Sequence, residues 1–117
     1  MSDRPVALLV EDMLERIDRI ARYTRGLDHD AFVDDDKTVD AVVRSFEVIG
    51  EAARRLPSEF KASHAEIPWH QIAGLRNRIV HEYFDVDVDL VWEIVRTELP
   101  RLKVSLSRLR DTGAAGG

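Results

Sequence analysis

The chain has 117 residues, no cysteine and a formal net charge of −5; 44% of its residues are hydrophobic and 33% are charged. This balance is typical of one globular domain and differs from that of a disordered chain, which has too few apolar residues to offset its ordering entropy. The lack of cysteine excludes disulfides, thiolate zinc sites and cysteine nucleophiles. The acidic balance argues against a protein that coats nucleic acid non-specifically, but it is compatible with a local basic site.

No targeting or membrane-spanning segment is expected. The N-terminal residues MSDRPVALLV lack the basic start and the longer apolar run of a signal peptide. No other stretch approaches the ~18 apolar residues of a membrane span. We therefore expect a cytoplasmic protein without a membrane partner.

Apolar residues that recur every three or four positions predict four main helices. The first carries the apolar positions from Val6 to Leu27 and is broken near its end by Gly26. After the polar connection LDHDAFVDDD, the second helix begins at Asp35 or Asp36 and stops before Pro57.

The second half of the chain predicts the other two helices. Residues 57–67 are expected to form an irregular connection with room for one helical turn. The third helix begins near Pro68 and turns one apolar face to the core, made of Ile72, Leu75, Ile79 and Tyr83. The stretch DVDVD (85–89) alternates like a strand, but it is too short and acidic to find a partner, so we interpret it as a turn before the last helix. That helix continues to Leu109 and is kinked or interrupted at Pro100.

The predicted fold is all-α, because no β-branched run is bounded by hairpin signals. Short connections between about four main helices favour a single up-and-down bundle over residues 1–111. The remaining residues, 112–117, are expected to form a flexible tail.

The segment RNRIVHEYF, residues 76–84, holds the polar side chains best suited to chemistry. An imidazole near guanidinium groups suits phosphoryl transfer, because His exchanges a proton near neutral pH and Arg binds a phosphate or a developing phosphorane. On a helical wheel at ~100° per residue, His81 centres the face opposite the core and Arg76 lies ~140° round the axis from it. The two would converge only if the helix is irregular, if Arg76 uses its length, or if a second subunit completes the site.

A plain solvated helix face is the simpler interpretation, and spacing alone favours it by roughly two to one. Gly74 favours a functional site, because glycine inside a helix costs about 1 kcal/mol against alanine and lets another backbone or a ligand approach.

Other candidate sites are weaker. His64 and His70 lack a nearby carboxylate at metal-ligand spacing, and the acids at 34–36 are explained by a helix start. The acids within 85–89 lack the glycine and glutamate of a calcium loop. We therefore predict no metal site and no cofactor.

The string Arg76-Asn77-Arg78-Ile79-Val80-His81-Glu82-Tyr83 resembles the R-N-x-x-x-H-x-Y signature of HEPN ribonucleases of the HepT family. The segments 47–57, 67–77 and 81–95 also resemble HepT segments in the same order, so the resemblance covers most of the chain. It implies an all-helical homodimer in which motif helices of both subunits line one cleft. It also implies a metal-independent endoribonuclease, the toxin of a type VII toxin–antitoxin pair.

The resemblance also implies a role for each motif residue. His81 would be the general base or acid around attack of the RNA 2′-hydroxyl on the adjacent phosphate, which leaves a 2′,3′-cyclic phosphate. Arg76 would stabilise the phosphorane, Asn77 would orient the substrate or the helix, and Arg78 is a further candidate for binding RNA. The family's antitoxins are MNT-type nucleotidyltransferases that silence the toxin by transferring AMP to the motif tyrosine, here Tyr83.

Two other interpretations stay open. The chain could be a non-catalytic HEPN partner that binds a nucleotidyltransferase or a nucleotide, or a plain helical interaction module. The intact set of Arg76, His81 and Tyr83 favours the ribonuclease, because a binding protein would tolerate loss of His81.

Overall fold

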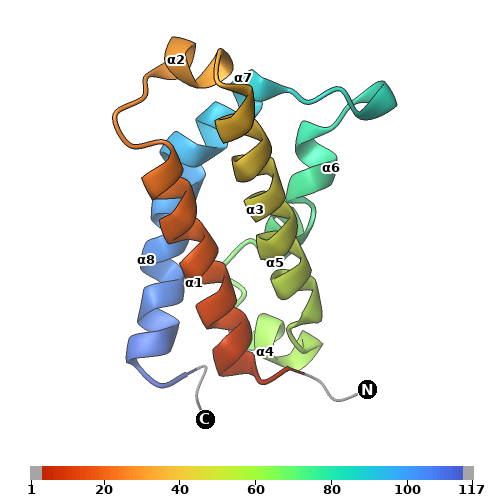
Figure 1. The fold of residues 1–117 in the computed structure, drawn as a ribbon. Coiled ribbons are helices and arrows are strands. Elements are labelled where there is room, and N and C mark those ends of the chain that lie inside the picture. Colours follow the sequence, from red (N-terminus) through yellow and green to blue (C-terminus); the bar gives the residue numbers. More distant parts are fainter. Residues whose placement is uncertain (1–3, 115–117) are drawn as a thin grey trace.

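A computed structural model describes residues 4–114, apart from the side chain of Phe84. The predicted all-α class is confirmed: these residues form helices and no sheet, and their one β-bridge joins Val80 to Val86. The chain runs up in α1 (Val6–Tyr23), down in α3 (Asp36–Arg55), up through α5 and α6, and down again through α7 and α8 (Figure 1). Half of the predicted tail, residues 115–117, lies outside the described residues.

The ends of α3 lie where the sequence places them. Asp35 caps the helix, since its carboxylate accepts a hydrogen bond from the backbone N–H of Thr38 at 3.1 Å. The hydroxyl of Thr38 also donates to this carboxylate, at 2.7 Å. These two contacts, the side-chain one first, lower the pKa of Asp35. The helix ends at Arg55, before Pro57. Asp35 and Asp36 therefore form a helix start, as predicted, whereas Asp34 follows the end of the preceding short helix.

Two short helices lie in segments predicted as connections. The first is α2 (His29–Val33), where Asp28 accepts a hydrogen bond from Ala31 N at 2.9 Å and Phe32 is fully buried. The second is α4 (Ser58–Ser63), the single helical turn for which the sequence left room. The connection prediction was wrong for α2, because one capped turn that buries one aromatic ring is too short to produce a periodic pattern.

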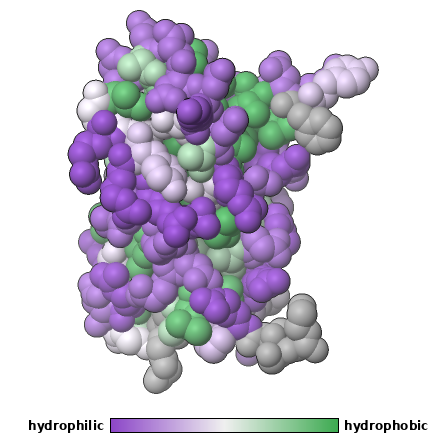
Figure 2. All heavy atoms as spheres, viewed as in Figure 1, coloured by the Kyte–Doolittle hydropathy of each residue, from purple (hydrophilic) through white to green (hydrophobic). Residues whose placement is uncertain are grey.

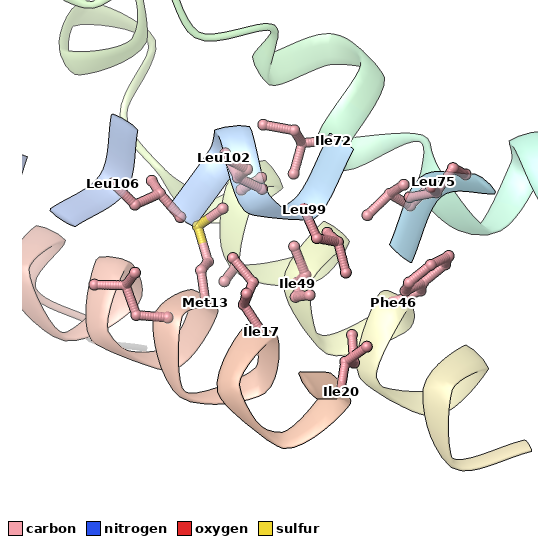
Figure 3. Close-up of a cluster of buried hydrophobic side chains, with 14 of the residues drawn as sticks. Met13, Ile17, Ile20, Phe46, Ile49, Ile72, Leu75, Leu99, Leu102 and Leu106 are labelled. Atoms are coloured by element: carbon pink, nitrogen blue, oxygen red, sulfur yellow. The ribbon is translucent and has the colours of Figure 1, made fainter. Parts of the chain in front are cut away.

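The core lies between the long helices and the α5–α6 pair. Figure 3 shows its side chains pointing toward one another from four directions: Met13, Ile17 and Ile20 from α1, Phe46 and Ile49 from α3, Ile72 and Leu75 from α5 and α6, and Leu99, Leu102 and Leu106 from α8. All are buried, and removing them from water is the main force that holds the helices together. The face seen in Figure 2 is mostly hydrophilic, with apolar residues in scattered patches.

The last helical stretch is continuous in direction but irregular in its turns. It comprises α7 (Val88–Glu93), a π-helical segment at Ile94–Glu98 and α8 (Leu99–Asp111). Leu99 N donates to Ile94 O, five residues back, directly before Pro100. Proline has no N–H and its ring clashes with the carbonyl four residues back, so a wider turn accommodates it. The interruption predicted at Pro100 is therefore this π segment. Within residues 4–114, no helix is long and apolar enough to cross a membrane.

Within one chain, the close approach between helices occurs at Gly50 and not at Gly74. The approach of a ligand or of a second copy at Gly74 stays a prediction. A Cβ atom added at Gly50 would lie 3.1 Å from the carbonyl oxygen of Ala73, so α3 passes directly against the end of α5. At Gly74 an added Cβ would meet only the carbonyl oxygens of His70 and Gln71, on its own segment. Gly74 marks the break between α5 and α6, whereas Gly50 sets the distance between α3 and the motif.

Candidate functional site

The helix that carries the motif is shorter than predicted. The predicted helix from Pro68 to Tyr83 is α5 (Trp69–Ala73), a break at Gly74 and α6 (Leu75–Ile79). Beyond Ile79 the chain is extended and folds back as a hairpin, in which Asp87 N donates to Ile79 O at 2.7 Å.

Pairing of Val80 with Val86 explains the early helix end. His81 N donates to Asp85 O at 2.7 Å across the same hairpin, and Val80 and Val86 are both half-buried against the core. β-Branched residues fit such a pairing better than a continued helix. The prediction that the stretch 85–89 finds no strand partner is therefore wrong for Val86. The prediction that the last helix begins after a turn in this stretch is confirmed, because α7 begins at Val88.

Tyr83 lies at the tip of this hairpin, in the short 3-10 turn η1 (Glu82–Phe84). The other three residues of the predicted core face, Ile72, Leu75 and Ile79, are buried, but Tyr83 is 96% exposed. Its backbone is left-handed, with φ 56° and ψ 33°. The prediction that Tyr83 lies on the core face was wrong, because the turn leaves the helix axis before it reaches this residue. The teal segment that projects from the body in Figure 1 is this hairpin.

His81 is exposed and has a carboxylate beside it. Its side chain is 58% exposed, and Nε2 lies 3.4 Å from Oδ2 of Asp87. The other carboxylate oxygen of Asp87 accepts a hydrogen bond from Leu90 N at 3.0 Å, which caps α7. These two contacts, the backbone one first, lower the pKa of Asp87. The carboxylate beside the imidazole is thus fixed by the start of α7.

Arg76 lies on α6 and faces α3. Its Nε is 3.7 Å from Oε2 of Glu47, so the two exposed side chains form a loose ion pair. Arg76 also lines a groove of about 280 Å³ together with Arg44, Arg54 and Glu47. Sequence reasoning missed both carboxylates, Glu47 and Asp87. The only signal for Asp87 was its place in the alternating stretch 85–89.

The next two motif residues line a different groove. Asn77 and Arg78 border a groove of about 800 Å³ that extends along α5 to α4. The two terminal nitrogens of Arg78 donate to the two carboxylate oxygens of Glu98 at 2.9 and 2.7 Å, and this contact raises the pKa of Arg78. His81 lines neither of these grooves. One chain therefore does not gather Arg76, Asn77 and His81 around a single hollow along α6.

The donor set of the described chain does not form a metal site. Among residues 4–114, no three His, Asp or Glu side chains lie close enough together to hold an ion. The hydrogen-bonding and ionic groups around the motif are two arginines, an amide, an imidazole and their carboxylate partners. This set can bind an anion and move a proton.

Comparison with known proteins gives a consistent result. The family model described as "Ribonuclease HepT-like" matches residues 13–109. A protein of Thermococcus cleftensis named "Probable ribonuclease HepT" is 42% identical over 101 residues, which cover 86% of this chain and 92% of that protein. "Putative RNase MJ1380" of Methanocaldococcus jannaschii is 35% identical over 103 residues, 88% of this chain and 94% of its own. No solved structure matches.

Proposed function

The chain belongs to the HepT-like ribonuclease family, and on this premise we propose that it is a metal-independent endoribonuclease, the toxin of a type VII toxin–antitoxin pair. The observation that carries the proposal is the hairpin after α6. It presents the imidazole of His81 to solvent, with the carboxylate of Asp87 at 3.4 Å, directly after the helix that bears Arg76 and Asn77.

The proposed reaction is transesterification within the RNA strand. The 2′-oxygen attacks the adjacent phosphorus while the imidazole of His81 takes the 2′-hydroxyl proton. The guanidinium of Arg76 stabilises the charge of the phosphorane, and Asn77 orients the strand or the end of α6. The bond from phosphorus to the 5′-oxygen then breaks, and the leaving oxygen takes a proton. The products are a 2′,3′-cyclic phosphate and a 5′-hydroxyl.

The test is cleavage of RNA by the purified, unmodified protein in EDTA. We expect cleavage with 2′,3′-cyclic phosphate ends, and we expect His81→Ala to abolish it. The variant should keep its fold, because His81 is exposed and lies outside the core. A strict requirement for added magnesium would count against this mechanism, and unfolding of His81→Ala would mean that the residue is structural.

We propose that the active form is a homodimer. Arg76 faces α3 across a groove that His81 does not line, so a second copy that packs along α6 would supply what one chain lacks. Mixing inactive Arg76→Ala with inactive His81→Ala protein tests this directly. If each subunit supplies one residue to a shared site, the mixture regains part of the activity. Activity retained by a protein that light scattering finds monomeric would refute the dimer.

We propose that a nucleotidyltransferase antitoxin silences the toxin by transferring AMP to Tyr83. Exposure of 96% makes the phenol accessible to another protein, and its position two residues after His81 would place a bulky anion beside the reacting phosphate. After co-expression with the cognate transferase, intact-mass spectrometry should find AMP on wild type and not on Tyr83→Phe. Tyr83→Phe should stay toxic. Equal AMP addition to both proteins would place the modification elsewhere.

The alternative, a non-catalytic HEPN partner, makes opposite predictions. Such a protein would bind the nucleotidyltransferase or a nucleotide equally well after His81→Ala, and neither form would cleave RNA. The pairing of His81 with a fixed carboxylate favours the ribonuclease, because binding alone does not require an oriented imidazole.

A further inference from the structure

The larger groove beside the motif is unusual for this acidic protein. It has a volume of about 800 Å³ and runs from α4 along α5 to α6. None of the residues that line it is acidic, although the chain carries 22 acidic and only 17 basic residues. Its polar lining comprises Arg54, Lys61, His70, Gln71, Asn77 and Arg78.

Two of the cations are available to a ligand. Arg54 is 57% exposed, and its guanidinium is oriented by hydrogen bonds to Ala73 O at 2.7 Å and to Glu51 at 3.1 Å. An exposed pair such as Arg54 with Glu51 contributes little, so a phosphate can replace the carboxylate at low cost. The ammonium of Lys61 forms no ion pair within residues 4–114. Arg78 is less available, because Glu98 holds both of its terminal nitrogens.

The groove continues to the candidate catalytic arginine. Arg54 and Ala73 line both this groove and the smaller one that contains Arg44 and Arg76. A path that contains cations therefore leads from Lys61 through Arg54 to Arg76. In the smaller groove it also passes Glu51 and Glu47, which form exposed ion pairs with Arg54 and Arg76. Along α5, from Trp69 to Ala73, the path is about 6 Å long at 1.5 Å per residue, and it continues onto α6 beyond the break at Gly74.

The groove offers cations to phosphates but no exposed Phe, Tyr or Trp ring on which a base could stack. Trp69 is the one aromatic residue other than histidine in its lining, and this side chain is only 7% exposed. Its Nε1–H donates to His64 O at 3.0 Å. This hydrogen bond holds the buried ring in place, so it does not stack on a base. Recognition by cations without stacking tolerates any sequence.

From these observations we propose that the groove binds the phosphodiester backbone of single-stranded RNA next to the nucleotide that is cleaved. Lys61 and Arg54 are the contacts that hold the strand. The inference deepens the proposed ribonuclease function and rests on it. It assigns a second part of the substrate site, outside the R-N-x-x-x-H-x-Y motif.

The test measures binding separately from cleavage. Fluorescence anisotropy of a labelled, short single-stranded oligoribonucleotide is recorded against salt concentration in a His81→Ala background. Adding Arg54→Gln and Lys61→Gln removes two phosphate contacts, which reduces the slope of log K against log salt by about 1.4, at ~0.7 per contact for single strands. If affinities converge at 1 M salt, binding at 0.1 M falls about 25-fold. A 2′-deoxy strand should lose the same slope, because it has the same phosphates.

A charge-matched control distinguishes the groove from overall charge. Arg22→Gln with Lys103→Gln also removes two exposed cations, neither of which lines the groove. Equal loss of slope in this control would overturn the proposal. Lys61→Gln alone should reduce the slope by about 0.7 and leaves the bond from Arg54 to Ala73 in place, so misfolding of the double variant cannot hide the result.

Kinetics separate this inference from the proposed function. In an otherwise wild-type chain, Arg54→Gln with Lys61→Gln should raise KM and leave kcat unchanged, because the contacts hold the strand equally before and during the reaction. Cleavage with an unchanged KM and slope would refute the groove and leave the ribonuclease intact. Absence of cleavage by wild type would refute the ribonuclease, whatever the binding data.

Discussion

Replacing Tyr83 with glycine should stabilise the protein. Tyr83 has φ 56° and ψ 33°, a left-handed conformation that costs a residue with a Cβ atom about 1–2 kcal/mol. Glycine adopts it without that cost, but it loses about 0.5–1 kcal/mol more conformational entropy on folding. The ring is 96% exposed, so its removal sacrifices almost no packing. The net gain in the free energy of unfolding is about 0.5–1 kcal/mol.

Thermal unfolding can detect a change of this size. A chain of 117 residues has an unfolding entropy of about 0.25 kcal/mol/K at ~2.1 cal/mol/K per residue, so the melting temperature should rise by about 2–4 °C. Tyr83→Phe is the matched control, because phenylalanine keeps both the Cβ atom and the backbone cost. We expect its melting temperature to equal that of wild type. Urea unfolding at constant m-value provides a second measurement.

Two results would refute the reasoning. Destabilisation by Tyr83→Gly would mean that the tyrosine ring packs against the body, and stabilisation by Tyr83→Phe would locate the cost in the hydroxyl group. If the prediction holds, a strained and exposed tyrosine is retained at the expense of stability. Strain of this kind is typical of functional positions, which fits the proposed modification of Tyr83.

Three further predictions follow from the fold. Gly50→Ala should destabilise by about 0–2 kcal/mol, because overpacking against the carbonyl oxygens of α5 costs about 1–3 kcal/mol and helix propensity returns about 1. Gly74→Ala should destabilise less in the same urea titration, because its Cβ would meet only carbonyl oxygens of its own segment, the nearer at 3.3 Å. Ser45→Ala should stabilise by about 1 kcal/mol, because the buried Ser45 hydroxyl has no hydrogen-bond partner among the described residues; a loss of stability would reveal one. The lowered pKa of Asp87 means that its carboxylate stabilises the fold above the ordinary carboxyl pKa and ceases to do so as pH falls through the lowered one. Unfolding measured against pH should thus bring Asp87→Asn, which keeps a capping side chain, closer to wild type below about pH 4, and a constant gap would contradict the assignment.

The sequence predicts the long helices well, because their signals agree. In α3 the apolar period, the acidic cap at Asp35 and the stop at Pro57 all indicate the same boundaries. The hairpin could not be predicted in this way. Val80 ends a helical pattern and Val86 lies in an acidic stretch, and only their pairing across the turn shows that either is extended. Neither segment contains that information alone. The helix predicted from local periodicity therefore ended four residues too late, at Tyr83 and not at Ile79.

In the candidate site, too, the sequence reveals some residues and not others. Arg76, Asn77, Arg78, His81 and Tyr83 are identifiable from the motif, since its spacing is written in consecutive residues. Their carboxylate partners are not identifiable, because each contact joins separate elements: α6 meets α3, and the first strand of the hairpin meets the start of α7. The helical wheel therefore placed His81 and Tyr83 on a regular helix, and the angles that it gave for these two residues do not exist in the fold.

The reason for expecting a second subunit consequently changes. On a continuous helix, Arg76 and His81 would diverge by angle alone, and a small irregularity could reunite them. In the structure His81 has left the helix altogether, and its orientation is set by the hairpin and by Asp87. Arg76 is directed toward α3, at the end of the path from Lys61. If a strand lies in that path, as proposed, it meets Arg76 in a groove that His81 does not line. We therefore propose that the projecting hairpin of a second copy brings the imidazole to the strand.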